Sequence, residues 1–157
     1  MTTVAIFPGT FDPITFGHQD VVMRATRIFD QIIVGVAENV AKVPLFSYAQ
    51  RIEMVKNALT GYNNLQVLGF SNLLVDFAKQ HNARVIIRGV RVATDFEHEL
   101  QLADMNRTLA ADIETIFFSS VKQYGYISST LVKEVAYLGG NISAFVNADV
   151  AKALRAK

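Results

Sequence analysis

The stretch VAIFPGTFDPITFGH, residues 4–18, begins as an apolar strand and ends on a histidine. Its two prolines have no backbone N–H for a sheet, so we expect a strand over Val4–Phe7 and then a loop. Apolar residues at helical spacing predict a helix over His18–Phe29. In α/β sheets, ligands bind where strands end, and helix N-termini offer free N–H groups to anions. The stretch therefore indicates an anion site at His18, although a plain tight turn with His18 as a cap fits equally well.

The composition predicts one globular domain over residues 1–157. Hydrophobic residues make up 51% of the chain and charged residues only 18%, against about 25% in a typical domain. Such a chain forms a sheet buried on both faces, an oligomer, or both. The formal net charge is +1, so we expect no nucleic-acid or membrane partner, and a local basic cluster remains possible.

The cysteine count is zero, which excludes disulfides, thiolate metal sites and thiol nucleophiles. A chain without cysteine suits a reducing compartment. No apolar run approaches the roughly 18 residues of a membrane span. We therefore expect a cytoplasmic protein.

Strand-like and helix-like patterns alternate along the chain, as is typical of an α/β fold. The further strands are predicted at residues 32–37, 65–70, 85–87 and 115–118, and the further helices at 47–59, 73–80, 95–111, from 128 or 129 to 139, and from 147 onward. Five parallel strands flanked by helices predict a single Rossmann-like, doubly wound domain. The pattern does not reveal the order of the strands.

Hydrogen-bond donors follow four of the five predicted strands. Because parallel strands end at one edge of a sheet, these segments should meet there. The donors are Thr10, His18, Lys42, Arg88, Arg91, Lys122, Ser128, Ser129 and Thr130. Singly, each could be a surface charge or a helix cap, but together they predict a polyanionic ligand. The fingerprints G-x-G-x-x-G and G-x-x-x-x-G-K-[ST] are absent, which argues against a Rossmann dehydrogenase and a P-loop NTPase.

Motifs along nearly the whole chain resemble known nucleotidyltransferases. PGTFDPITFGH (8–18), with its T-x-G-H, RGVR (88–91) and YGYISST (124–130) are similar to those of the superfamily related to class I aminoacyl-tRNA synthetases. SNLLVDFA (71–78), DFEHELQLADMNR (95–107) and ISSTLVKEV (127–135) resemble the bacterial phosphopantetheine adenylyltransferase family. The resemblance implies adenylyl transfer from ATP to 4'-phosphopantetheine with magnesium, giving dephospho-coenzyme A and pyrophosphate in coenzyme A biosynthesis. It also implies a homohexamer.

The resemblance further implies roles for individual residues. Thr10, His18 and Lys42 would be catalytic, and phosphopantetheine would be held by Thr10, Lys42, Leu74 and Arg88. ATP would be held by Thr10, Phe11, His18, Gly89, Val90, Arg91, Glu99, Tyr124, Gly125, Tyr126, Ile127, Ser128, Ser129 and Thr130. No residue is implied as a metal ligand, so magnesium would bind mainly through the ATP phosphates.

Two positions depart from patterns common among relatives. Val43 stands beside Lys42 where relatives often carry a second basic residue. Lys133 stands where many superfamily members have arginine, and the resemblance assigns it no contact with substrate.

The implied chemistry is in-line attack of one phosphate on another. An ionised phosphate needs no general base, so we expect a single displacement without a covalent intermediate. One alternative is a nicotinamide mononucleotide adenylyltransferase, which should lack the segment around Leu74. The other is a non-catalytic nucleotide sensor, which would not need His18.

Overall fold

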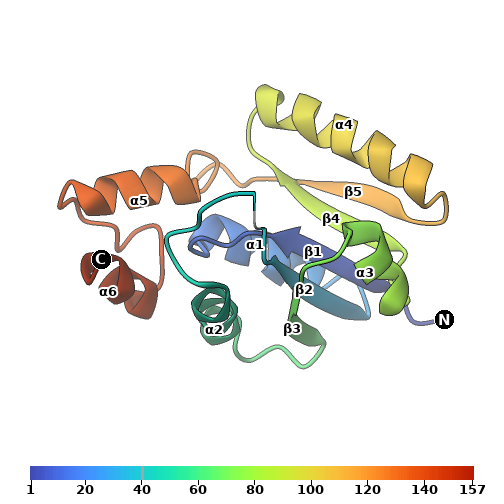
Figure 1. Ribbon diagram of the computed structural model, residues 1–157, viewed down its shortest axis with the longest axis horizontal. Coiled ribbons are helices and arrows are strands. Elements are labelled where there is room, and N and C mark those ends of the chain that lie inside the picture. Colours follow the sequence, from blue (N-terminus) through green and yellow to red (C-terminus); the bar gives the residue numbers. More distant parts are fainter. Residues whose placement is uncertain (40) are drawn as a thin grey trace.

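Five strands form one parallel sheet in the computed structural model, which describes residues 1–39 and 41–157. The strands are β1 (Val4–Gly9), β2 (Gln31–Ala37), β3 (Leu65–Phe70), β4 (Val85–Val90) and β5 (Glu114–Ser119). The helices are α1 (Phe16–Ala25), α2 (Tyr48–Ala58), α3 (Leu74–Gln80), α4 (Ala93–Leu109), α5 (Ser129–Tyr137) and α6 (Ala148–Arg155). The predicted α/β class and the five parallel strands are confirmed (Figure 1).

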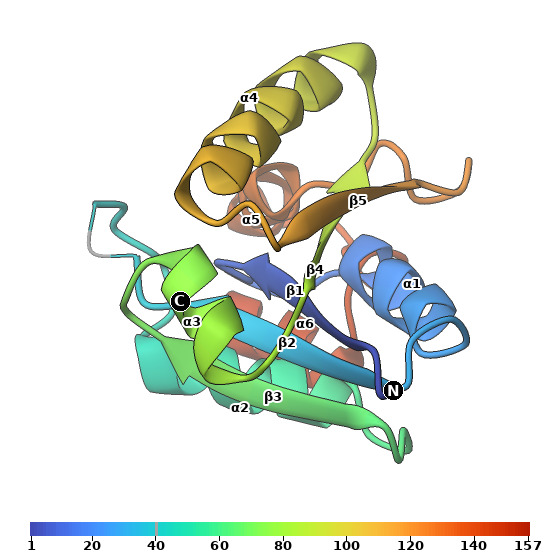
Figure 2. The same cartoon turned by 90° about the vertical axis from the view of Figure 1, so that its right-hand side faces the viewer.

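Helices pack against both faces of the sheet, and successive strand residues point to opposite faces. Ala5 and Phe7 pack in one cluster with apolar residues of α1, α2, α5 and α6. Ile6, between them, packs in a second cluster with residues of α3. Burial on both faces explains why β2 is an almost unbroken apolar run (Figures 1 and 2).

The strand order is β3-β2-β1-β4-β5. The chain first steps outward from β1 through β2 to β3, and then returns to the other side of β1 to add β4 and β5. The direction thus reverses between β1 and β4, and in open α/β sheets the crevice at such a reversal is where ligands bind.

The predicted end of the first strand at Phe7 was wrong, because β1 continues through Pro8 to Gly9. β1 pairs with β2 over six residues, but its register with β4 covers only Ala5 and Ile6. Beyond Ile6, the β4 side of β1 carries no ladder, so the missing N–H of Pro8 costs nothing there. The Pro8 carbonyl on that side accepts a hydrogen bond from Arg88 Nη1 instead, at 3.3 Å.

Helix boundaries differ from the prediction where capping decides them. α1 begins at Phe16, capped by Thr15, so His18 is its third residue and not its first. The predicted cap at Ser47 is confirmed with Gln50 as its partner. Of the two serines left open as the cap of α5, the structure selects Ser128.

Two further strand and helix predictions need correction. β4 runs on through Val90, past the predicted end at Ile87, and α1 stops at Ala25, short of Phe29. Within the described ranges, no helix combines the length and apolar character needed to cross a bilayer.

Helix α4 is the longest of the described helices, and few of its residues are buried. Only Glu99 and Ala103 are buried on it. Leu102, Met105 and Leu109, at 36%, 63% and 52% exposure, lie at positions i, i+3 and i+7 and form what we call the outer stripe of α4. In both views, α4 lies beside β5 at one flank of the molecule (Figures 1 and 2).

Candidate active site

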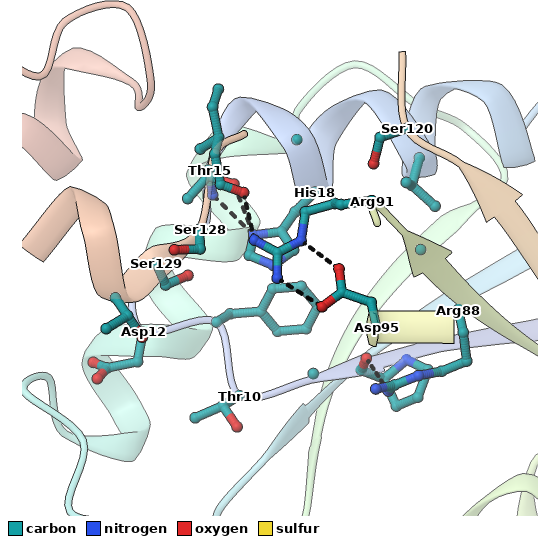
Figure 3. Close-up of a pocket in the computed structure, with 18 of the residues that line it drawn as sticks. Thr10, Asp12, Thr15, His18, Arg88, Arg91, Asp95, Ser120, Ser128 and Ser129 are labelled. Atoms are coloured by element: carbon teal, nitrogen blue, oxygen red, sulfur yellow. Dashed lines mark hydrogen bonds and ion pairs between the residues drawn. The ribbon is translucent and has the colours of Figure 1, made fainter. Parts of the chain in front are cut away.

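A cavity of about 670 Å³ opens at the carboxyl ends of β1 and β4. It is the crevice that the reversal of strand order predicts. Of the residues singled out from the sequence, those that line it are Thr10, Phe11, His18, Lys42, Arg88, Gly89, Arg91, Glu99, Tyr124, Ile127, Ser128, Ser129 and Thr130. Four other candidates, Leu74, Val90, Gly125 and Tyr126, are not part of its lining, nor is Lys122. Figure 3 shows labelled side chains from four separate segments around this cavity.

The hydrogen bond at Nδ1 determines the protonation of the His18 ring. The Thr15 amide donates to His18 Nδ1 at 3.0 Å, completing the capping box of α1. Burial lowers the pKa of His18 to about 4, and the positive charges of Arg91 and Arg88 add to this effect. At neutral pH the ring is therefore uncharged with its proton on Nε2, which leaves one neutral donor for a ligand.

The turn from β1 to α1 is strained and tightly packed. Phe11 has a φ of 51°, which is costly for a bulky side chain. Its ring packs edge-on against His18, with centroids 5.1 Å apart, and edge-on against Phe7. A Cβ on Gly9 would lie 2.9 Å from Phe11 Cζ, so only glycine leaves room for this ring. The Phe11 ring in this turn therefore packs against the His18 ring and helps to hold it in place.

Arg88 is held by a carboxylate but keeps free donors. Its Nε and Nη2 donate to the two oxygens of Glu99 at 2.6 and 2.7 Å, and Nη1 donates to the Pro8 carbonyl. A guanidinium carries five N–H groups, so two remain for a ligand. Glu99 therefore fixes the orientation of Arg88, whose remaining N–H donors lie on the β4 side of the cavity (Figure 3).

Arg91 joins the β4 end to the loop before α5. Its Nε donates to Asp95 at 3.0 Å, and its Nη1 donates to the Ile127 carbonyl at 3.0 Å. The segment that carries Tyr124 and Ser128 is therefore tied to the same strand that carries Arg88.

The first turn of α5 faces the cavity. Ser128 Oγ accepts the Leu131 amide at 3.1 Å as the helix cap, and Ser129 Oγ donates to the Pro13 carbonyl at 2.7 Å. Both predicted serine side chains are thus engaged within the protein. The backbone N–H groups of Ser129 and Thr130 lie in the first turn, where no acceptor exists within the helix, and they suit an anion.

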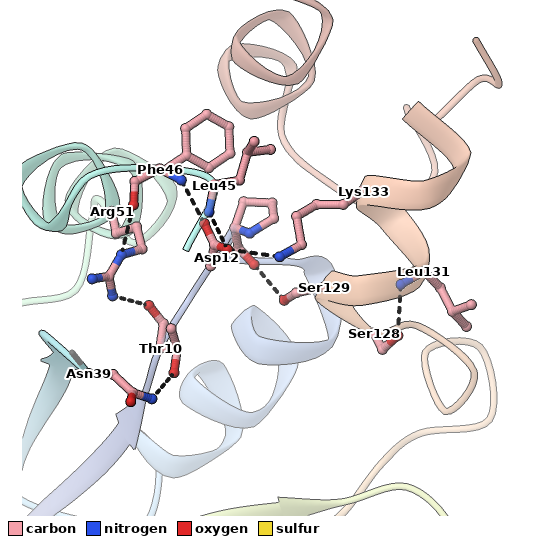
Figure 4. A network of polar contacts seen from close by, with 11 residues as sticks. Thr10, Asp12, Asn39, Leu45, Phe46, Arg51, Ser128, Ser129, Leu131 and Lys133 are labelled. Atoms are coloured by element: carbon pink, nitrogen blue, oxygen red, sulfur yellow. Dashed lines mark hydrogen bonds and ion pairs between the residues drawn. The ribbon is translucent and has the colours of Figure 1, made fainter. Parts of the chain in front are cut away.

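Asp12 is a residue that the sequence interpretation missed. Its buried carboxylate accepts hydrogen bonds from the amides of Leu45 and Phe46 and from Lys133 Nζ (Figure 4). Burial alone would raise the pKa of Asp12, but the bonds from Lys133 and the two amides outweigh it, and the pKa is lowered. The only hint in the sequence is a single charged residue in an otherwise uncharged loop.

Arg51 was also missed. It is 1% exposed and donates only to backbone carbonyls. Its spacing of four residues from the fully buried Val55 puts both on the inner face of α2, and that spacing was a usable signal.

The charges around the cavity favour an anion, because four cationic side chains line it, Lys42, Arg88, Arg91 and Lys133, against three carboxylates. Its carboxylates Asp12, Asp95 and Glu99 are paired with Lys133, Arg91 and Arg88. Among the described residues, no cluster of three acidic or histidine side chains is placed to hold a metal ion.

A second, smaller cavity of about 230 Å³ lies beside the ends of β2 and β3. Ala37, Glu38, Phe70 and Asn72 are among its lining residues. Leu74 begins α3 two residues after Asn72 and packs in the same apolar cluster as Phe70. This places Leu74 near the second cavity, away from the main one.

Comparisons with known proteins give one consistent result. A family model described as cytidylyltransferase-like matches residues 6–135. Phosphopantetheine adenylyltransferase from Nitrosomonas eutropha is 54% identical over 97% of this chain and 93% of its own length. The enzyme of the same name from Thioalkalivibrio sulfidiphilus is 50% identical over 100% and 99%. A solved structure of Plasmodium falciparum nicotinic acid mononucleotide adenylyltransferase shares the fold, with a TM-score of 0.71 at 12% identity over 97% of this chain and 94% of that one.

Proposed function

The chain belongs to the cytidylyltransferase-like family, and from this membership and its full-length relatives we propose that it adenylylates 4'-phosphopantetheine. ATP is the donor, and dephospho-coenzyme A and pyrophosphate are the products. The observation that carries the proposal is the cavity at the β1/β4 reversal, where one neutral imidazole donor meets two anchored guanidinium groups.

The two sides of the cavity suit the two substrates. The α5 N-terminus, Arg91 and His18 offer donors for the triphosphate of ATP. Lys42 and the two free N–H groups of Arg88 suit the phosphate of the acceptor. The pantetheine arm would then extend toward the second cavity and Leu74.

Positioning supplies most of the proposed chemistry. The acceptor phosphate attacks the α-phosphorus in line, and two anions must be held together despite their repulsion. Lys42 and Arg88 offset that repulsion, while His18 Nε2 and Thr10 donate to oxygens whose charge grows in the transition state. Magnesium bound to the ATP phosphates would neutralise further negative charge there.

The assay that tests this function is pyrophosphate release from ATP with alternative acceptors. Phosphopantetheine should support turnover, and nicotinamide mononucleotide should not. Turnover with the mononucleotide alone would select the alternative adenylyltransferase, and binding of ATP without any turnover would select the nucleotide sensor.

The stereochemistry at phosphorus tests the single displacement. ATP made chiral at the α-phosphorus should give dephospho-coenzyme A of inverted configuration, because one in-line attack inverts the centre. Retention would require a covalent intermediate and would make His18 the nucleophile.

The exposed apolar surface and the composition support two further proposals for the protein in the cell. We expect a homohexamer, because the outer stripe of α4 leaves apolar surface uncovered. We also expect the reaction in the cytoplasm, where a chain without cysteine is at no disadvantage.

A further inference from the structure

Arg51 lies directly beneath the cavity and has no surface on it. Its guanidinium is fully buried between α2 and the ends of β1 and β2. Nη1 donates to the carbonyls of Thr10 and Ala37, each at 2.7 Å. Nη2 donates to the Glu38 carbonyl at 3.1 Å, and Nε donates to the Phe46 carbonyl at 3.2 Å.

These four carbonyls belong to the two loops that carry Thr10 and Lys42. Thr10 follows β1, and the loop with Lys42 is bounded by Ala37 at one end and Phe46 at the other. One side chain therefore fixes both ends of the Lys42 loop against Thr10, the residue that would contact ATP. Figure 4 shows the contacts of Arg51 with Thr10 and Phe46. A second tie joins the same loops, because Asn39 Nδ2 donates to Thr10 Oγ1 at 3.3 Å.

The arrangement is an unusual use of a buried charge. Among the described residues, Arg51 forms no salt bridge to a carboxylate. Its charge is balanced by carbonyl dipoles, by the Tyr48 ring, 5.7 Å from the guanidinium carbon, and by the more distant carboxylates of Asp12 and Glu38. A buried cation without an ion pair is a weak source of stability, whereas four directed hydrogen bonds define a geometry.

We propose that Arg51 is a positioning residue for adenylyl transfer, because it sets the separation between the Thr10 loop and the Lys42 loop. The inference rests on the proposed function, in which Thr10 binds the nucleotide and Lys42 binds the acceptor phosphate. In a reaction that depends on alignment, a displacement of about 1 Å costs about 100-fold in rate.

Arg51→Lys is the informative substitution. It keeps the charge in place, but a single ammonium nitrogen cannot reach carbonyls that accept from three separate nitrogens. We expect kcat to fall about 100-fold while the KM of each substrate changes only a few-fold. The matched control is Val55→Ala, which creates a cavity on the same face of α2 and lowers stability but removes none of the hydrogen bonds that Arg51 donates. Its kcat should stay within about 2-fold of wild type.

A double-mutant cycle separates positioning from mere support of the fold. Arg51→Lys is combined with Thr10→Ala and, separately, with Lys42→Ala. If Arg51 acts through these residues, its effect on kcat shrinks in at least one of the two backgrounds. An undiminished effect in both backgrounds, or a kcat loss matched by Val55→Ala at equal thermal stability, would overturn the proposal.

Asn39→Gly keeps the proposal testable if Arg51→Lys does not fold. Asn39 has a φ of 52°, which glycine adopts freely, so the variant removes the second tie without backbone strain. We expect about a 10-fold loss of kcat at unchanged melting temperature, and an unchanged kcat would count against the proposal. If wild-type enzyme fails to use phosphopantetheine, the proposed function fails by itself, and the cycle is then measured by the dissociation constant of ATP in the Thr10 background.

Discussion

The His18 ring uses its two nitrogens for different purposes. Nδ1 caps α1 at the Thr15 amide, and Nε2 is left for a ligand. His18→Ala should therefore lower kcat by roughly 100-fold or more, and the lost cap should cost about 0.5–2 kcal/mol of stability. His18→Gln, which can restore the capping box, should recover the melting temperature but not kcat. Near wild-type kcat in either purified variant would remove His18 from the mechanism.

The depressed pKa of His18 makes the stability of the fold pH-dependent. Its folded pKa is about 4 and its ordinary value is 6.5. The unfolded chain therefore binds a proton in this window that the folded chain does not, and stability falls as the pH drops from 6.5 toward 4. His18→Gln should flatten the curve of melting temperature between pH 4.5 and 7. The NMR titration of His18, assigned with the same variant, should have its midpoint near 4. A midpoint near the ordinary value of 6.5 would contradict the lowered pKa.

Arg88 forms an ion pair with Glu99 and keeps two N–H groups free for a ligand. Arg88→Ala should weaken phosphopantetheine by roughly 10- to 100-fold and ATP by less, because the free N–H groups suit the acceptor phosphate. It also leaves the Glu99 carboxylate unpaired, so stability should drop. Arg88→Lys is the control that keeps a charge beside Glu99. Calorimetric titration of each substrate checks the assignment, and a larger defect for ATP would reverse it.

At the scale of elements, the β1–α1 turn depends on the absence of a side chain at Gly9, because the Phe11 ring occupies that space. Gly9→Ala would push its Cβ into the Phe11 ring, which in turn supports His18. We expect a loss of about 1–3 kcal/mol in stability together with a lower kcat. Phe11→Leu in the same chain should relieve the clash and restore part of the stability. Thermal melts of the single and double variants test this, and an unchanged melting temperature for Gly9→Ala would show that the ring moves freely.

Elements whose signal is local could be predicted from the sequence. The strand Leu65–Phe70 and the cap at Ser47 follow from neighbouring residues and are confirmed. The end of β1 was mispredicted because the cost of Pro8 depends on the extent of pairing with β4. That pairing partner lies about eighty residues away in the chain and leaves no local trace.

The residues of the candidate site likewise fall into those that the sequence could predict and those that it could not. Side chains in motifs, such as Thr10 and His18, could be named because a known family shares them, and the structure brings them to one cavity. Asp12 could not, because its partners are mostly backbone groups of a distant segment. The spacing between Arg51 and Val55 indicates that Arg51 is buried, but not that it bonds to the carbonyls of Thr10 and Ala37. Backbone donors and acceptors carry no residue type that a sequence pattern could reveal.

For the molecule as a whole, the exposed apolar surface predicts self-association. We expect sedimentation at micromolar concentration to give about six times the 17.4 kDa of one chain. Met105→Glu should reduce this mass by placing a charge on the outer stripe of α4. Asn57→Glu on the exposed side of α2 adds the same charge and should leave the mass unchanged. A single 17.4 kDa species for the wild type would exclude assembly.

The short register between β1 and β4 makes the sheet a pair of plates joined along a narrow seam. One plate, β3-β2-β1, carries Thr10, and the other, β4-β5, carries Arg88. A substrate that binds residues of both plates would bridge the seam and hold the two parts of the sheet together. The seam amides should accordingly exchange hydrogen with solvent faster than the β1–β2 ladder in the free protein, and the bound substrates should abolish the difference.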